Sequence, residues 1–315
     1  MLAIGIETWG GPDALHVVDL PEPHPGPGQV RVRVAAAGVA PVDAMARSGL
    51  LAPLYKGQQP PFVPGMEVAG ILDEVGPDTT NDLPLGSPVV AFVSFAGANG
   101  GYSDWVIVPA ASVIRAPEGL TMAEAATTVL NPLTARNALD TLQLAPGATL
   151  LVTGAAGAVG GYVTTLAARE GLQVVAQVGA GDVERARSAG ATWLVSRNDN
   201  LAEAVHELLP EGVDAVVDTA GLGEAAAAAV KDGGQVAALR PFPGVAGRGI
   251  TVHGLNVRQR ATDQAALSAL RDLVEQGLLP VHLGETFPAR EASRAHQSLE
   301  SGAAKGRIVL EFPVG

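Results

Sequence analysis

The most constraining feature of this sequence is a run of small residues at 154–160, which lies between an apolar segment and a helix-like one. Residues 149–153 have the composition of a buried strand, and residues 159–170 have that of a helix. A strand, a turn of glycine and alanine, and a helix in this order let a diphosphate approach the backbone, because no side chain obstructs it and the first amides of the helix are free to bind it. Gly160 also permits close packing of the helix on the strand. The segment predicts a dinucleotide-binding unit.

The residues that follow the turn repeat the same alternation. Strand-like and helix-like segments take turns up to residue 239, where we expect the sheet to end. This pattern is typical of βαβ units, whose strands are parallel and whose helices cover both faces of the sheet. The fold class is therefore α/β, with a doubly wound Rossmann sheet. The predicted strands are 149–153, 174–178, 193–195, 215–218 and 236–239, and the predicted helices are 159–170, 184–188, 201–209 and 224–231.

The first third of the chain has a different sequence pattern. Short apolar runs such as 30–34 and 89–93 are cut by proline and glycine, which predicts a barrel-like or sandwich-like β domain. Residues 122–142 are helix-like. The tail holds two helix-like segments, 263–275 and 290–299, and a final strand.

The length of 315 residues favours two domains. We expect a β domain at 1–120, the dinucleotide-binding domain at 121–256, and a C-terminal segment at 257–315 that returns to the first domain.

Composition and charge exclude several classes of function. Hydrophobic residues make up 47% of the chain and charged ones 17%, so an ordered, well-packed protein is expected. The net charge of −12 gives no general attraction to nucleic acid or to anionic lipid. The chain has no cysteine, and therefore no disulfide and no thiolate–zinc site. No apolar run is long enough to span a membrane and no secretory signal is evident, so we expect a cytoplasmic protein without a nucleic-acid or membrane partner.

The end of the second predicted strand bears on the choice of coenzyme. NAD-binding units place an acidic residue there to bind the ribose hydroxyls. Here Val178 and Gly179 occupy that place, which favours NADP(H) and leaves NAD(H) as the alternative. The nearest basic candidates for a 2′-phosphate are Arg185 and Arg187, and solvated helix charges are an equal interpretation of both.

Four further segments carry a resemblance to a known family: 38–49 (GVAPVDAMARSG), 64–70 (PGMEVAG), 100–105 (GYSDW with its preceding glycine) and 295–310 (AHQSLESG followed by KGRIVL). With the glycine turn, they make the chain resemble the zinc-independent quinone oxidoreductase branch of the medium-chain dehydrogenase/reductase superfamily. The resemblance implies a GroES-like β-barrel catalytic domain, a Rossmann domain, a coenzyme between them and a homodimer.

The resemblance also implies roles for particular residues. It assigns the diphosphate to Ala156, Gly157, Ala158, Val159 and Gly160, which contact it as one turn. It places Thr134 beside the nicotinamide ribose or the phosphate, and Leu239 and Arg240 along the nicotinamide, with Arg240 also facing the acceptor. Arg307 matches a basic position that reaches the coenzyme phosphates, and a surface charge before an edge strand is the alternative.

The acceptor pocket departs from the family pattern. Ala40 and Leu51 stand where many relatives have Asn and Tyr, which makes the pocket more apolar. Tyr55 is a candidate for a substitute hydroxyl, with a packed or exposed loop tyrosine as the alternative. Asp43 and Arg47 are expected to pair structurally, and we assign neither a catalytic role.

Zinc is not expected. Zinc-dependent relatives have Cys and His where this chain has Ala40 and Met66, which are not zinc ligands, and the six histidines show no metal-ligand spacing. Without a Lewis acid, alcohol oxidation is disfavoured. A quinone or an α,β-unsaturated carbonyl already accepts hydride at carbon, so it needs positioning more than metal activation. We therefore predict an NADPH-dependent quinone or enone reductase with no indispensable catalytic side chain.

Two alternatives stay open at this point. An enoyl-thioester reductase needs room for a pantetheine arm and a tyrosine acid, for which Tyr55 is the candidate. A non-catalytic NADPH-binding sensor is the other.

Overall fold

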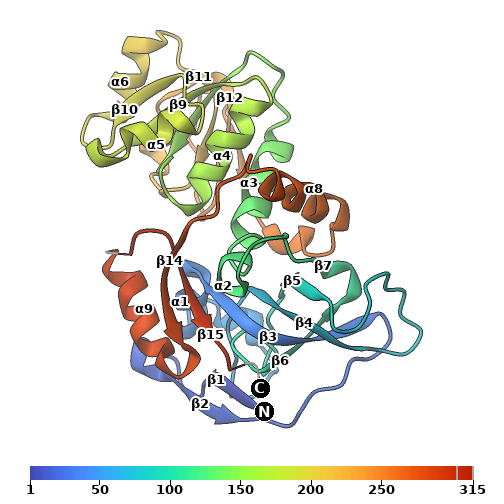
Figure 1. Ribbon diagram of the computed structural model, residues 1–315. Helices are drawn as coiled ribbons and strands as arrows, with labels where there is room; N and C mark the ends of the chain where they lie inside the picture. The colour runs from blue at the N-terminus through green and yellow to red at the C-terminus, as the bar shows by residue number, and fades with distance from the viewer. Residues whose placement is uncertain (303, 314–315) are drawn as a thin grey trace. The chain divides into compact units, whose positions relative to one another are not determined.

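The computed structural model describes residues 1–302 and 304–313. The chain divides into two compact units (Figure 1). The first comprises Met1–Leu130 together with Ala261–Gly315, and the second comprises Asn131–Arg260. Residues 121–130, which we assigned to the dinucleotide-binding domain, lie in the first unit because the Glu67 carboxylate accepts the amides of Val129 (3.3 Å) and Leu130 (2.8 Å).

The first unit is rich in antiparallel strands. Its strands are β1 (Leu2–Ile6), β2 (Leu15–Asp19), β3 (Gln29–Val39), β4 (Glu67–Val75), β5 (Pro88–Phe92), β6 (Trp105–Pro109), β7 (Val113–Arg115), β14 (Leu283–Pro288) and β15 (Arg307–Glu311). Its helices are α1 (Pro41–Ser48), α2 (Met122–Ala125), α8 (Gln264–Glu275) and α9 (Ala292–Ser301), with short 3₁₀ turns η1 (Pro12–Ala14), η2 (Ala52–Tyr55), η3 (Ala110–Ser112) and η6 (Ala289–Glu291).

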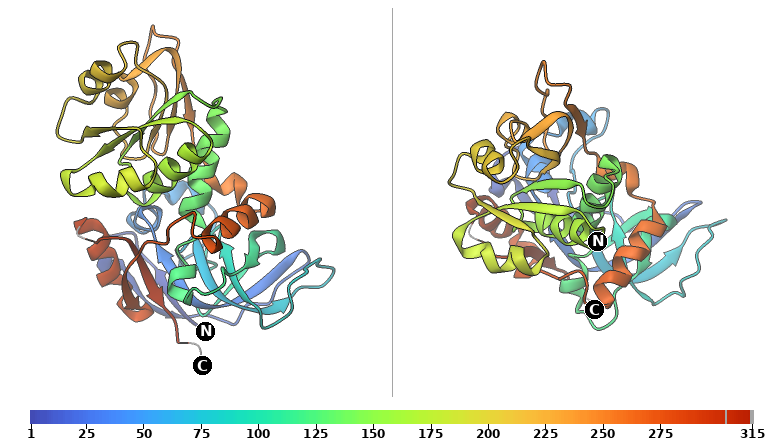
Figure 2. Two further views of the ribbon diagram at one scale, coloured as in Figure 1. Left: turned by 45° about the horizontal axis from the view of Figure 1, so that its top comes forward. Right: turned by 90° about the horizontal axis from the view of Figure 1, so that it is seen from above.

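Strand β3 organises this unit. One edge pairs with β4, and the other edge pairs first with β6 and then with β15. The pairing of β3 with β4 shifts register at Arg31/Val32 and at Val34/Ala36, and the second shift lies where β3 changes its other partner from β6 to β15. The main sheet has the order β14-β15-β3-β4-β5-β7, and β1 and β2 form a separate pair. Figure 2 shows the C-terminal strands, in red, beside the blue β3, so the tail belongs to the first unit.

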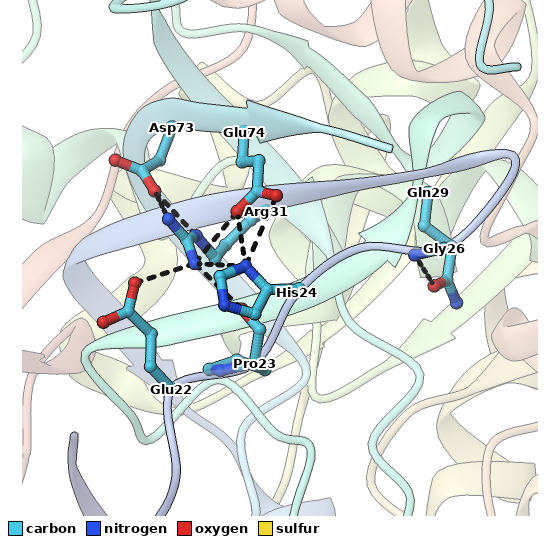
Figure 3. A network of polar contacts seen from close by, with 8 residues as sticks. All are labelled: Glu22, Pro23, His24, Gly26, Gln29, Arg31, Asp73 and Glu74. Carbon is cyan, nitrogen blue, oxygen red and sulfur yellow. Dashed lines mark hydrogen bonds and ion pairs between the residues drawn. The ribbon is translucent and has the colours of Figure 1, made fainter. Parts of the chain in front are cut away.

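A charged cluster on β3 and β4 ties the loop before β3 to the sheet (Figure 3). The Arg31 guanidinium contacts Glu22 at 2.8 Å, Asp73 at 2.6 Å and Glu74 at 3.0 Å, and it donates to the carbonyl of Pro23 at 2.9 Å. Arg31 is buried while its three carboxylate partners are partly exposed. One cation therefore compensates three anions that otherwise repel one another.

The second unit is a parallel sheet covered by helices. Its strands are β8 (Thr149–Thr153), β9 (Gln173–Val178), β10 (Trp193–Ser196), β11 (Val213–Asp218), β12 (Val230–Ala238) and β13 (Thr251–Gly254). Its helices are α3 (Leu130–Leu142), which begins at the last residue of the first unit, α4 (Ala158–Arg169), α5 (Val183–Ser188), α6 (Leu201–Leu208) and α7 (Glu224–Ala227), with 3₁₀ turns η4 (Ala180–Asp182) and η5 (Val257–Arg260).

The strand order β10-β9-β8-β11-β12-β13 is that of a doubly wound Rossmann sheet. The chain starts at β8 in the middle, builds outward to β10, and then returns to build the other half from β11. Alternate side chains of the strands face opposite layers. Leu151, Val175 and Val216 pack with residues of α6 and α7 on one face, whereas α4 contacts β8 and β9 outside that cluster. The predicted α/β Rossmann sheet is confirmed.

Three element predictions were wrong. Residues 122–142 form two helices, α2 and α3, because α2 ends at Ala125 and the Glu67 carboxylate accepts the amides of Val129 and Leu130 where α3 begins. Residues 224–231 are helical only to Ala227, since Val230 already pairs with Val213 of β11. Residues 236–239 do not end the sheet, because β13 pairs outside β12.

In the part of the chain that is described, no helix combines the length and the apolar character that crossing a membrane requires.

Candidate functional site: the coenzyme turn and a buried polar cluster

The turn after β8 has the geometry that the small residues predict. Gly154 adopts φ = 57°, a left-handed conformation that favours glycine, and its carbonyl accepts the Gly157 amide at 2.8 Å. A Cβ on Gly160 would lie 2.2 Å from the Gly154 carbonyl oxygen. Helix α4 therefore approaches the turn as closely as it does only because residue 160 has no side chain.

The start of α4 presents backbone amides. Gly157 is its N-cap and supplies no side-chain hydrogen bond. The amides of the first helical turn have no partner within the helix, and the positive end of the helix dipole adds to their attraction for an anion. Gly157 and Ala158 are exposed, whereas Ala156 and Val159 are half-buried. The turn thus offers donors at an accessible surface, which fits a dinucleotide diphosphate.

The end of β11 builds the other side of this position. Strands β8 and β11 are neighbours where the strand order reverses, and ligands of such sheets bind at the carboxyl ends there. The buried Asp218 carboxylate accepts the amides of Gly221 (3.0 Å), Leu222 (3.1 Å) and Gly223 (2.9 Å). It also accepts the Thr153 hydroxyl at 2.7 Å. Sequence reasoning missed Asp218, although an acid at the end of a strand followed by a glycine-rich segment was a usable signal.

The predicted nicotinamide residues lie at this same edge of the second unit. Leu239 and Arg240 follow β12, and the Leu239 amide donates to the Asp218 carbonyl at 3.3 Å. A Cβ on Gly221 would lie 2.7 Å from the Arg240 side chain, so Arg240 rests over the loop that Asp218 holds. Thr134 is a buried residue of α3.

The end of β9 holds Val178, which is buried, and Gly179. A Cβ on Gly179 would lie 3.2 Å from the guanidinium carbon of Arg197, a residue that follows β10. Sequence reasoning missed Arg197 and named Arg185 and Arg187 instead. Arg185 forms an ion pair with Asp182 at 2.7 Å.

In the first unit, the predicted pocket residues surround the start of α1 and η2. Ala40 is the buried N-cap of α1, and Leu51 is the half-buried residue before η2. Tyr55 is 3% exposed, and its ring packs against Trp9, Phe62 and Phe95 with centroid distances of 5.4, 4.6 and 5.9 Å. This arrangement supports the packing interpretation of Tyr55.

A buried polar cluster lies next to Ala40. The Asp43 carboxylate accepts the amides of Ala40 at 2.8 Å and Gly65 at 2.9 Å. The Tyr102 hydroxyl is 3.4 Å from Asp43 Oδ2 and 3.2 Å from His296 Nε2. Asp43 therefore fixes the two segments that carry Ala40 and Met66, the positions of zinc ligands in zinc-dependent relatives.

Burial shifts the pKa values in this cluster in opposite directions. It raises the pKa of Asp43 to about 7, although the two backbone amides oppose the shift. It lowers the pKa of His296 to about 3, and the Arg47 charge adds to the effect. It also raises the pKa of Tyr102, with the Asp43 charge as the second cause. The imidazole is thus neutral at neutral pH.

The predicted pairing of Asp43 with Arg47 is wrong. Asp43 is held by backbone amides and Tyr102, while Arg47 forms its ion pair with Glu300 near the end of α9. The reason is that Arg47 lies in the last turn of α1, away from the N-terminal end that Asp43 caps.

Arg307 is 4% exposed and forms an ion pair with the fully buried Glu67. Its surroundings are not those of a surface charge before an edge strand, since β15 pairs on both sides with β14 and β3.

Among residues 1–302 and 304–313, no group of three or more His, Cys, Asp or Glu side chains is placed to hold a metal ion. Met66 is buried, and the buried Glu67 follows it in the sequence. A zinc-free site therefore stays a prediction that rests on Ala40 and Met66.

Comparison with known proteins decides the family. Residues 26–118 match the alcohol dehydrogenase GroES-like domain, and residues 189–310 match a domain described as zinc-binding dehydrogenase. The chain is 32% identical to the 2-haloacrylate reductase of a Burkholderia species, over 98% of both chains. It belongs to the quinone oxidoreductase branch of the medium-chain dehydrogenase/reductase superfamily.

Other members of this superfamily are similar over nearly the whole chain. A chloroplast envelope quinone oxidoreductase homolog of Arabidopsis thaliana is 28% identical over 96% of this chain and 95% of its own length. A mycobacterial protein solved in complex with NADPH superposes with a TM-score of 0.86 at 29% identity, and the match covers 99% of this chain and 100% of that one. The superfamily fold that the sequence resemblance implied is confirmed.

Proposed function

We propose that this protein reduces quinones or α,β-unsaturated carbonyl compounds by hydride transfer from NADPH without zinc. The observation that carries the proposal is the turn from Gly154 to Gly160, whose exposed residues Gly157 and Ala158 lie where the strand order of the Rossmann sheet reverses. Among similar proteins, one acts on a haloacrylate, one is named for quinones and one is complexed with NADPH.

The residues of the chain fit the coenzyme. The turn from Ala156 to Gly160 would hold its diphosphate through the amides at the start of α4, and Leu239 and Arg240 would border the nicotinamide. NADPH supplies a hydride when it is bound. The task left to the protein is to hold the acceptor carbon at attack distance in surroundings that limit water.

A conjugated acceptor agrees with the residues at the positions that hold zinc ligands in zinc-dependent relatives. A methyl group at Ala40 and a thioether at Met66 give no metal to polarise an alcohol. A conjugated acceptor needs no such polarisation because its own carbonyl oxygen takes up the developing charge. Ala40 and Leu51 make the surroundings apolar, which suits an uncharged ring or alkene.

No side chain is assigned as the proton donor. Tyr55, the acid that an enoyl-thioester reductase would use, packs within an aromatic cluster, and solvent protonates the product in our proposal. Tyr55→Phe separates the two functions. A loss of kcat with enoyl thioesters and none with enones supports the thioester alternative.

The test of the function is a coenzyme titration followed by an acceptor screen. Dialysed protein should bind NADPH and oxidise it with a naphthoquinone or an enone, and it should not oxidise simple alcohols with NADP⁺. Zinc measured by elemental analysis should be far below one atom per chain. Tight NADPH binding without turnover over the whole panel points to the non-catalytic sensor instead, and stoichiometric zinc contradicts the proposal.

We also propose a homodimer. Strand β13 is the outermost strand of the parallel sheet as described, and its outer edge is able to pair with β13 of a second copy. Light scattering on a sizing column should give twice the chain mass of 31.8 kDa. A cytoplasmic location stays a prediction of the sequence, which fractionation of the producing cells tests.

A further inference from the structure

Arg197 lies where Rossmann proteins distinguish NADPH from NADH. Strands β9 and β10 are parallel neighbours, with Ser196 in register with Val178. The next residue, Arg197, donates its amide to the Val178 carbonyl at 2.9 Å. This register sets Arg197 beside Gly179, at the carboxyl end of the second strand of the Rossmann sheet, where the adenosine ribose is bound in this fold.

The guanidinium occupies the space of a missing side chain. A Cβ on Gly179 would lie 3.2 Å from Cζ and from Nε of Arg197, and 3.4 Å from Nη2. In an NAD-specific unit an acidic side chain starts from this end of the strand and binds the ribose hydroxyls. Here the same space holds a cation that comes from the neighbouring strand. The local charge is thus reversed.

Arg197 is also available to a ligand. Its side chain is exposed, and it makes no ion pair or hydrogen bond with another residue among those that the structure describes. Arg185 differs because its guanidinium is already paired with Asp182. Arg187 lies on α5 and is exposed, and the three atoms nearest to a Cβ on Gly179 all belong to Arg197.

We infer that Arg197 binds the 2′-phosphate of NADPH and sets the preference for NADPH over NADH. The inference rests on the proposed coenzyme site and names the residue that decides its specificity. A guanidinium forms charge-assisted, bidentate hydrogen bonds with a phosphate, and the Arg197 side chain is exposed, so a ligand can reach its donors. The ribose hydroxyl of NADH offers no such charge.

The central experiment compares Arg197→Gln with the matched control Arg187→Gln. Dissociation constants for NADPH and NADH are measured by fluorescence titration. Loss of a charge-assisted hydrogen bond weakens binding by about 10- to 100-fold, so Arg197→Gln should weaken NADPH by that factor and NADH by less than about threefold. Arg187→Gln should change neither. Equal weakening of both coenzymes by Arg197→Gln, unchanged NADPH affinity, or a selective NADPH loss in Arg187→Gln overturns the inference.

A second variant adds charge instead of removing it. Gly179 has φ = −80° and ψ = 160°, a conformation open to any residue, so Gly179→Asp needs only a small movement of the flexible Arg197 side chain. Its carboxylate would pair with Arg197 and repel a 2′-phosphate. NADPH affinity should fall while NADH affinity is kept or gained. An unchanged ratio of the two affinities contradicts the inference.

Binding of nucleotide fragments gives a readout that is independent of turnover. Adenosine 2′,5′-bisphosphate should bind wild type more tightly than adenosine 5′-monophosphate, which differs only by lacking the 2′-phosphate, and Arg197→Gln should remove the difference. Failure of the inference is distinguishable from failure of the proposed function. If wild type binds NADPH and reduces an enone but Arg197→Gln keeps its discrimination, only the assignment of Arg197 is wrong. If wild type binds neither coenzyme, the proposed function itself is wrong.

Discussion

Two adjacent glycines at the start of α4 provide the sharpest test of the coenzyme turn. A Cβ on Gly160 would lie 2.2 Å from the Gly154 carbonyl oxygen and 2.9 Å from Cα of Ala155, and both atoms are backbone. A Cβ on Gly161 would meet nothing closer than the Ala155 carbonyl oxygen at 3.7 Å, which is ordinary contact. The same substitution, Gly→Ala, therefore forces the turn apart at one position and leaves it intact at the next.

The two substitutions should change the free energy of unfolding in opposite directions. Alanine in a helix interior is favoured over glycine by roughly 1 kcal/mol, so Gly161→Ala should stabilise the protein by about 0.5–1 kcal/mol. Gly160→Ala has the same gain but adds overpacking against backbone, which costs about 1–3 kcal/mol, so it should destabilise by about 1–2 kcal/mol. Because the displaced atoms belong to the turn, its NADPH dissociation constant should also rise by about tenfold or more.

Urea unfolding and NADPH titration of both variants measure these effects. The expected order of unfolding midpoints is Gly161→Ala, then wild type, then Gly160→Ala, with NADPH affinity lost only in Gly160→Ala. If Gly160→Ala is as stable as Gly161→Ala and binds NADPH as wild type does, the close approach of α4 to the turn is not a requirement of the fold and our account of the site is wrong.

Three further predictions concern the polar clusters. Asp218→Ala removes the acceptor of three backbone amides and of the Thr153 hydroxyl. It should lower the free energy of unfolding by about 2–3 kcal/mol, measured by urea unfolding, and weaken NADPH binding, measured by coenzyme titration. Arg31→Gln leaves Glu22, Asp73 and Glu74 without their shared cation, which should cost about 2 kcal/mol in urea unfolding, and less at high salt. The raised pKa of Asp43, about 7 against 3.8, makes stability fall as pH rises from about 4 to 7, whereas the lowered pKa of His296, about 3 against 6.5, makes stability fall as pH drops from 6.5 toward 3. Each effect changes the free energy of unfolding by about 4 kcal/mol over its pH range, and the two effects oppose each other. Acidification from pH 6.5 to 4 should therefore destabilise Asp43→Asn, in which only the His296 effect remains, and stabilise His296→Gln, in which only the Asp43 effect remains. Parallel curves of stability against pH for the two variants would refute the assignment.

The coenzyme turn could be predicted because its determinants are local. Gly154, Gly157 and Gly160 lie within a single strand–turn–helix segment, and each is needed for a backbone reason that the spacing itself conveys. The alternation of strands and helices was readable for the same reason. Strand β12 was misassigned at its start because an alanine-rich run has helix propensity, which pairing with β11 overrides.

The charged residues of the site could not be predicted as well because their partners are distant in sequence. Arg47 lies four residues from Asp43, a spacing that suggests a helical pair, but its partner Glu300 is 253 residues away. Arg307 is paired with Glu67, which lies 240 residues before it. No periodicity conveys such contacts, since they exist only once β15 has paired with β3.

Arg197 shows the same limit at the coenzyme site. The sequence predicts basic candidates only in the residues that follow Val178 along the chain, Arg185 and Arg187. A 2′-phosphate is attracted by any cation close to it in space, wherever that cation lies in the sequence. The register of β9 with β10 places beside Gly179 the guanidinium of Arg197, which lies 18 positions further along the chain. This local cation matters in a chain of net charge −12, whose overall field repels a polyanionic coenzyme. Attraction must therefore come from short-range donors, the amides of the Gly154–Gly160 turn and the guanidinium of Arg197. Salt screens the distant repulsion more than these direct contacts, so NADPH affinity should depend only weakly on ionic strength, and a steep fall in affinity with salt would show that long-range attraction dominates instead.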